Sequence, residues 1–157
     1  MQIYGVSFDM VGKQPIVLLK TVDGNKFLPI WIGHPEAAAI LMKLQGASTP
    51  RPLTHDLVTD MLGELGVEIV RITVTELKEN TFYALIHLKT PSGPVAIDAR
   101  PSDAIALALR TRAPIFVEET VIDHAKTVDF STEKADADRL HKWLESLDPD
   151  DLGKYKM

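Results

Sequence analysis

The feature that most constrains the fold of this chain is an internal similarity at an offset of 67 residues. Aligning the chain with itself at this offset requires no gap. The alignment pairs Leu18 with Leu85, Ile30 with Ile97, Glu36 with Asp103, Ala37 with Ala104, Ala39 with Ala106, and Lys43 with Arg110. Similarity at a fixed period is typical of a repeated structural unit. We therefore expect two copies of one unit, near residues 3–45 and 70–112.

Each copy is predicted to contain three strands followed by a helix. Branched and aromatic residues dominate the expected strands, and the pair Asp23-Gly24 is typical of a hairpin turn. Val70, Ile72 and Val74 alternate with polar residues, which is the two-residue period of a half-buried strand. The six expected strands cover residues 3–8, 15–20, 26–32, 67–77, 81–89 and 95–98.

Start and stop signals predict the helices. In the first copy, Pro35 and Glu36 favour a helix start and Gly46 favours its end. In the second copy, residues 102–112 also fit a strand pattern, but their alanines and the start signal of Ser102 favour a helix. A helix at residues 54–65 is expected to connect the copies. Its apolar face is formed by Leu57, Val58, Met61, Leu62 and Leu65.

The predicted fold class is α+β, with a duplicated strand-strand-strand-helix unit around a mixed or antiparallel sheet. A chain of 157 residues is large enough to bury one core, and we assign residues 1–129 to this domain. Residues 130–157 are predicted to form an acidic helical extension. Within it, residues 133–147 have the pattern of an amphipathic helix, with Leu140, Trp143, Leu144 and Leu147 on one side.

Composition narrows the functional classes. The net charge is −5, but residues 1–117 are neutral, and the excess lies in residues 118–157, which carry six basic against eleven acidic residues. This balance disfavours a protein that only coats nucleic-acid phosphates. The sequence has no cysteine, no N-terminal secretion signal and no apolar run of the roughly 18 residues that span a membrane. We therefore expect a cytoplasmic protein with no membrane segment.

Two polar segments are candidates for chemistry, and the first precedes the connecting helix. Arg51 lies between two prolines, and Thr54, His55 and Asp56 follow it at the helix start. A helix N-terminus with arginine and histidine nearby attracts phosphate. The alternative is structural: Thr54 caps the helix, Asp56 complements its dipole and His55 is simply exposed.

The second segment lies between the last strand and the last helix of the repeat. Asp98 and Asp103 could share a divalent cation, and Arg100 could bind a phosphate. Alternatively, Arg100 joins the two carboxylates as an ion pair, while Ser102 and Asp103 cap the helix. Glu36 is equivalent to Asp103 in the first copy, so a pseudo-symmetric fold would bring both acids to one region.

Three segments together resemble the bifunctional nuclease domain family. They are residues 28–37, 51–57 and 98–108, and the resemblance extends over about residues 1–129. It implies an oligomeric α+β protein that cleaves both DNA and RNA, without assigning catalytic roles to individual residues. The polar positions that match are Glu36, Arg51, His55, Asp56, Asp98, Arg100, Ser102 and Asp103.

The leading hypothesis is metal-assisted hydrolysis of the DNA or RNA backbone. The candidate catalytic residues are His55, Asp56, Asp98 and Asp103; those for phosphate are Arg51, Arg100 and Ser102; and those for Mg²⁺ or Mn²⁺ are Asp98, Asp103 and Glu36. The alternative is a non-catalytic oligomeric binding or regulatory module. A homo-oligomer is expected in either case, because residues 37–42 and 104–109 are apolar nearly all round their helices.

Overall fold

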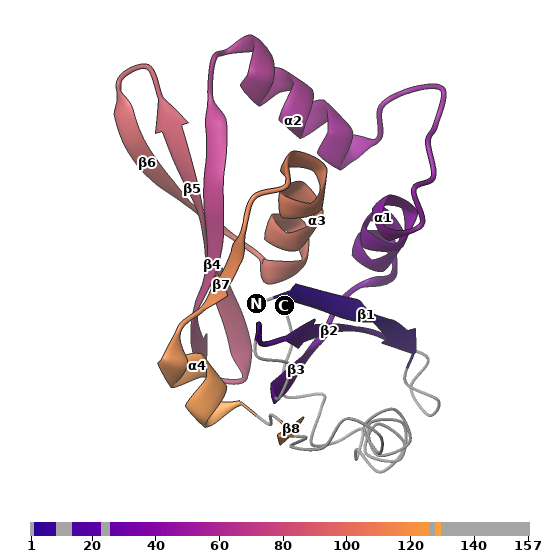
Figure 1. Ribbon diagram of the computed structural model, residues 1–157, viewed down its shortest axis with the longest axis vertical. Helices are drawn as coiled ribbons and strands as arrows, with labels where there is room; N and C mark the ends of the chain where they lie inside the picture. Colours follow the sequence, from indigo (N-terminus) through magenta and orange to yellow (C-terminus); the bar gives the residue numbers. More distant parts are fainter. Residues whose placement is uncertain (1, 9–13, 23–25, 126–127, 130–157) are drawn as a thin grey trace.

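The computed structural model describes residues 2–8, 14–22, 26–125 and 128–129. The predicted C-terminal extension at residues 130–157 lies outside the described residues. The strands form two sheets that face a group of helices between them (Figure 1). In the described ranges, no helix is long and apolar enough to cross a membrane.

The first unit forms sheet A and one helix. Three strands run antiparallel in sequence order, with β8 added to the edge by β3. Helix α1 follows β3 and packs on this sheet. The elements are β1 (Gln2–Phe8), β2 (Pro15–Lys20), β3 (Lys26–Trp31), α1 (His34–Leu44) and β8 (Val128–Asp129).

The second unit forms sheet B in the order β6-β5-β4-β7, in which β7 runs parallel to β4 and the other pairs are antiparallel. Helix α3 packs on β4 and β5, and α2 connects the two units. The elements are α2 (Thr54–Glu64), β4 (Glu68–Lys78), β5 (Thr81–Thr90), β6 (Gly93–Ala99), α3 (Pro101–Thr111), β7 (Ile115–Val117) and α4 (Glu119–His124).

The predicted duplication is confirmed in the order and pairing of the elements. Each unit is an antiparallel three-stranded meander followed by a helix, and α1 and α3 begin 67 residues apart, at His34 and Pro101. The α+β class is therefore confirmed. The strands form two sheets, however, because each unit keeps its own meander and the units meet through α1 and α3.

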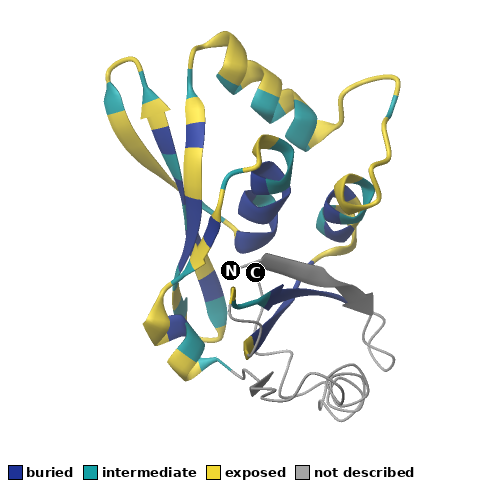
Figure 2. Cartoon of the chain, in the orientation of Figure 1, coloured by how far each residue is buried: buried dark blue, intermediate teal, exposed yellow. Residues whose placement is uncertain are grey.

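Helix α3 is the centre of the core. Its residues from Pro101 to Ala108 are buried apart from Asp103, because α1, α2 and sheet B cover it from different sides (Figures 1 and 2). Small alanines let these neighbours approach closely, while Ile105 fills the space between them at 0% exposure. The apolar surface of α3 that contributed to the prediction of a homo-oligomer is covered within its own chain, and the oligomer itself stays a prediction.

One strand departs from its expected alternation. Val70 was predicted to share a face with Ile72 and Val74, yet it is 40% exposed. The pairing of β4 with β5 shifts between Ile69 and Arg71, as in a β-bulge, and Ile69 occupies the buried face instead. A bulge adds one residue to a strand, so the side chains before it change faces.

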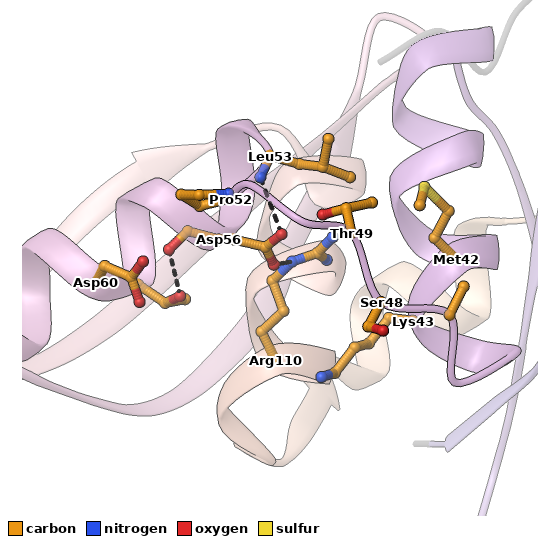
Figure 3. A pocket seen from close by; sticks show the side chains of 11 residues that line it. Met42, Lys43, Ser48, Thr49, Pro52, Leu53, Asp56, Asp60 and Arg110 are labelled. Atoms are coloured by element: carbon orange, nitrogen blue, oxygen red, sulfur yellow. Dashed lines mark hydrogen bonds and ion pairs between the residues drawn. The ribbon is translucent and has the colours of Figure 1, made fainter.

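Arg110 connects the three long helices. Its side chain is 5% exposed, and its Nε donates to Asp56 Oδ1 on α2 at 2.6 Å (Figure 3). The two terminal nitrogens donate to Ala106 O on α3 at 2.9 Å and to Ala39 O on α1 at 3.3 Å. A charge-assisted contact to a carboxylate is stronger than a neutral hydrogen bond, and it is directional. Arg110 thereby fixes how α2 begins relative to α1 and α3.

Arg110→Ala is expected to lower the free energy of unfolding by roughly 2–3 kcal/mol, since it removes the buried donor that Asp56 Oδ1 and the two helix carbonyl groups share. Urea denaturation followed by circular dichroism measures this loss. Arg51→Ala is the matched control, because Arg51 is exposed on the α1–α2 link, and its effect should stay below about 0.5 kcal/mol. Equal effects of the two substitutions would contradict the connecting role of Arg110.

Candidate active site

A four-residue polar cluster forms where the starts of α1, α2 and α3 meet. Arg100 Nη2 donates to Glu36 Oε1 and to Asp103 Oδ2, at 2.8 Å in both cases, and Arg100 Nε donates to Asp103 Oδ2 at 3.0 Å. His55 Nε2 lies 2.9 Å from Asp103 Oδ1. We call Glu36, His55, Arg100 and Asp103 the polar cluster.

The duplication explains why both acids reach the same arginine. Glu36 and Asp103 occupy the first turns of the equivalent helices α1 and α3. The residues before these helices are Gly33 and Arg100, and both have an extended backbone. The two units thus present an acid each, and only the second adds a cation between them. The prediction that a pseudo-symmetric fold brings both acids together is confirmed.

Gly33 provides the space that Glu36 needs. A Cβ atom at residue 33 would collide with Glu36 Oε2, so the carboxylate folds back over the glycine backbone. In the second unit, Arg100 stands at this position and its own side chain extends to the acids. This difference between the units directs Glu36 toward Arg100.

Helix α2 brings His55 to Asp103. His55 is the second residue of the helix, and its side chain is 15% exposed. The carboxylate of Asp103 holds its Nε2 atom, which leaves Nδ1 as the nitrogen that can exchange a proton with a bound molecule. A carboxylate that holds one imidazole nitrogen fixes the orientation of the ring, as in hydrolases that use histidine as a base.

The side chain of Asp56 holds the start of α2 in place. Its Oδ2 accepts the Leu53 N–H at 3.0 Å and its Oδ1 accepts Arg110 (Figure 3). The hydrogen bond from Leu53 and the contact with Arg110 lower the pKa of the Asp56 carboxyl, although partial burial opposes this. Leu53, rather than Thr54, is the N-cap of α2, and Asp56 satisfies its N–H.

The polar cluster opens into a pocket of about 660 Å³ between the three helices. The arginine at its edge is 52% exposed, whereas Glu36 is 15% exposed. Hydrogen bonds from Arg100 to Asp103 and then to Glu36 raise the pKa of Arg100, so the guanidinium stays charged. Apart from the polar cluster, the lining residues are Pro35, Ala38, Ala39, Met42, Leu53, Thr54, Val58 and Leu107.

Besides Asp56, three candidate residues lie outside this cluster. Asp98 is opposite Leu85 in the β5–β6 pairing, and Leu85 points away from the buried face formed by Ala84 and Ile86. Asp98 is therefore on the outer face of sheet B, because side chains alternate along a strand. Arg51 is exposed on the link before α2, and Ser102 is 1% exposed within the buried side of α3. The expected grouping of Asp98 with Asp103 is thus wrong.

The arrangement does not fit the expected divalent ion. Glu36 and Asp103 both bind the guanidinium of Arg100, and Asp98 lies on another face. Across the described residues, no group of three or more histidine, aspartate, glutamate or cysteine side chains is positioned to hold a metal. A cation between Glu36 and Asp103 would have to displace Arg100.

Arg110 was not among the residues singled out from the sequence. The signal that could have found it is a lone arginine in the last turn of an otherwise apolar helix, at the position equivalent to Lys43. Met42 and Leu107 also line the pocket. No sequence signal marks them, because each has the pattern of an ordinary core residue.

Comparisons with known proteins give the family of the chain. A family model described as the bifunctional nuclease domain matches residues 17–129. An uncharacterized protein of Mycobacterium tuberculosis is 39% identical over 96% of both chains. Bifunctional nuclease 1 of Oryza sativa subsp. indica is 28% identical over 67% of this chain and 33% of its own length. Bifunctional nuclease 2 of Arabidopsis thaliana is 30% identical over 66% of this chain and 32% of its own length.

Gly33→Ala is expected to displace the Glu36 carboxylate and break its contact with Arg100 while leaving the fold intact, since φ at Gly33 is −75° and suits alanine. The Arg100 guanidinium resonance in an NMR spectrum should shift. Gly63→Ala is the control, because nothing lies within 4 Å of a Cβ at that exposed helix position. It should leave the resonance unchanged and stabilise α2 by about 0.5–1 kcal/mol. An unshifted resonance in Gly33→Ala would contradict the packing of Glu36 on Gly33.

Proposed function

Because the chain belongs to the bifunctional nuclease domain family, we propose that it is a nuclease that hydrolyses phosphodiester bonds of DNA and RNA. The observation that carries this proposal is the hydrogen bond of His55 to Asp103 beside an exposed arginine, at the edge of a pocket. A nuclease needs a group that transfers protons and a cation that balances phosphate charge, and this cluster offers both.

In the proposed reaction, His55 is the proton-transfer group. Asp103 holds Nε2, and Nδ1 accepts the proton of the attacking water or returns one to the leaving oxygen. General acid–base catalysis of this kind contributes about 10²–10⁴-fold to a rate. Asp103 acts as a positioning residue, since it orients the imidazole and stabilises it when protonated.

Arg100 is proposed to bind the phosphate that is attacked. Glu36 and Asp103 accept from its Nε and Nη2 atoms, so Nη1 is the nitrogen that donates to a phosphate oxygen, and the guanidinium charge stabilises the negative charge that builds up in the transition state. Glu36 and Asp103 already hold it from one side, so its side chain is oriented before the substrate arrives. No step in this proposal uses a metal ion, because the residues of the polar cluster do not fit one.

The alternative of a non-catalytic scaffold accounts for other polar residues. Arg110, whose side chain is 5% exposed, forms a directional pair with Asp56 that connects helices, which is what scaffolding requires. The polar cluster differs in its arginine: Arg100 is 52% exposed beside open space, whereas the two acids, Asp56 and Asp103, are exposed to a similar extent. This difference in exposure favours chemistry at the polar cluster.

His55→Ala is expected to reduce cleavage of single-stranded DNA and RNA by about 10²–10⁴-fold, because it removes the proposed proton-transfer group. Asp103→Asn should give a smaller loss. Asp98→Asn is the matched control, as Asp98 lies on the outer face of sheet B, and it should retain full activity. All proteins need identical, extensive purification to remove contaminating nuclease. Equal cleavage by wild type and His55→Ala would refute the proposed chemistry.

We also propose that the protein is a homo-oligomer that associates through α2. The predicted apolar face of this helix is divided: Val58 and Leu62 pack against the core, but the remaining apolar residues are exposed. Their spacing of four residues places them along one side of the helix. This stripe consists of Leu53 at 36%, Leu57 at 50%, Met61 at 55% and Leu65 at 68% exposure. A continuous exposed apolar patch marks an interaction surface.

The expected cytoplasmic location stays a prediction.

Sedimentation equilibrium at micromolar concentration tests the association. The wild type is expected above the 17.4 kDa of one chain, and the double substitution Leu57→Asp/Met61→Asp should shift it to a single chain, because carboxylates cannot be buried at such an interface. Val22→Asp is the control, since Val22 is 79% exposed and remote from α2 in sequence. A wild type that sediments as one chain would exclude a stable oligomer.

A further inference from the structure

The pocket beside the polar cluster has an apolar part that the hydrolytic step does not use. We propose that this part binds one unstacked nucleobase of the substrate, so that the protein acts on single strands rather than on duplexes. The inference rests on the proposed function, because it takes the phosphate at Arg100 as the neighbouring contact.

The apolar part is built from all three helices. Ala38, Ala39 and Met42 come from α1, Leu53 and Val58 from α2 and its cap, and Leu107 from α3. Along α1, Met42 lies six residues beyond Glu36, which is about 9 Å at 1.5 Å per residue. Met42 is therefore set back from the charged side chains along α1. A nucleotide has the same division, with a charged phosphate, a sugar and a flat base.

The size of the pocket fits a nucleoside and not a duplex. Its volume of about 660 Å³ is within the roughly 300–1,000 Å³ of sites for small molecules. Inside a duplex, the base is stacked and paired, and enzymes that need a base in a pocket must first take it out of the stack. A single strand avoids that cost, so a pocket of this kind favours it.

Charge in the polar cluster makes contact with a base necessary. Two carboxylates surround one guanidinium, so the cluster is not cationic while His55 is neutral, and a phosphate gains little from long-range attraction. Strong phosphate binders instead use many lysine and arginine contacts, and their affinity falls steeply with salt. Apolar contact with the base must supply much of the affinity here. Binding should therefore depend weakly on salt, with a slope near −0.7 for a single phosphate contact.

The lining also determines which bases fit. Among the described lining residues outside the polar cluster, Thr54 is the polar side chain, and there is no amide or aromatic group. Reading a base requires hydrogen bonds to its edge, whereas apolar contact tolerates any base. The pocket therefore accepts different bases, and nothing in this lining requires a ribose 2′-hydroxyl. That is consistent with cleavage of both DNA and RNA.

The test uses fluorescein-labelled single-stranded oligothymidylate with phosphorothioate linkages, the same oligonucleotide with abasic residues, and a duplex of equal length. Fluorescence anisotropy with the full chain measures binding. Wild type is expected to bind the oligothymidylate at least about tenfold more tightly than the abasic strand or the duplex, since burying the apolar surface of one base contributes about this much. Ala38→Phe should abolish the preference, because Ala38 is exposed and lines the pocket, so the larger ring fills it without entering the core.

Ala96→Phe is the matched control, as Ala96 is exposed on β6 opposite His87, on the outer face of sheet B. It should bind like wild type, and thermal melting of both variants confirms that each is folded. Equal binding of base-containing and abasic strands by wild type would overturn the nucleobase pocket, even if His55-dependent cleavage were observed. Conversely, base-dependent binding without any cleavage would support the pocket and refute the proposed nuclease.

Discussion

The buried side chain of Arg110 is the interaction on which the arrangement of the site depends. It lies at the end of α3, yet it donates to the first turn of α2 and to a carbonyl of α1. Asp56, which receives it, also binds the N–H of the residue that caps α2. The start of α2 is thus held from two directions. Because His55 precedes Asp56 in the chain, the same contacts bring its ring within hydrogen-bond distance of Asp103.

Duplication supplies the second constraint. Two equivalent helices begin side by side, and each carries an acid in its first turn. Two carboxylates at one place repel each other unless a cation lies between them. Arg100 provides that cation in one unit, and Gly33 provides space in the other. The site is therefore asymmetric, although it is formed by a pseudo-symmetric pair of helices.

Similar polar side chains have different roles in this protein because their exposure differs. In the pair of Arg110 and Asp56, the arginine side chain is only 5% exposed. This pair fixes the helices relative to one another. The contact between Arg100 and Asp103 uses the same chemical groups, but Arg100 is 52% exposed and faces a pocket. A bound molecule can therefore contact Arg100 more readily than Arg110, whose side chain is largely covered. Exposure, rather than residue type, separates the structural pair from the candidate active site.

The sequence by itself determined the repeat, the order of strands and helices, and the family. These depend on local pattern: the 67-residue offset, the alternation along strands, and the signals at helix ends. It also indicated that Glu36 and Asp103 would meet, since they are equivalent positions of the two units. Tertiary packing decided three features of the fold: the split into two sheets, the bulge that turns Val70 outward and the covering of α3.

Tertiary packing also decided which residues belong to the candidate site. Asp98 and Asp103 are five residues apart, but the strand pairing sends Asp98 to the far face of sheet B, while His55 arrives from a distant segment. Sequence spacing does not specify on which side of a sheet a strand's last side chain lies, because that depends on its register with the neighbouring strand.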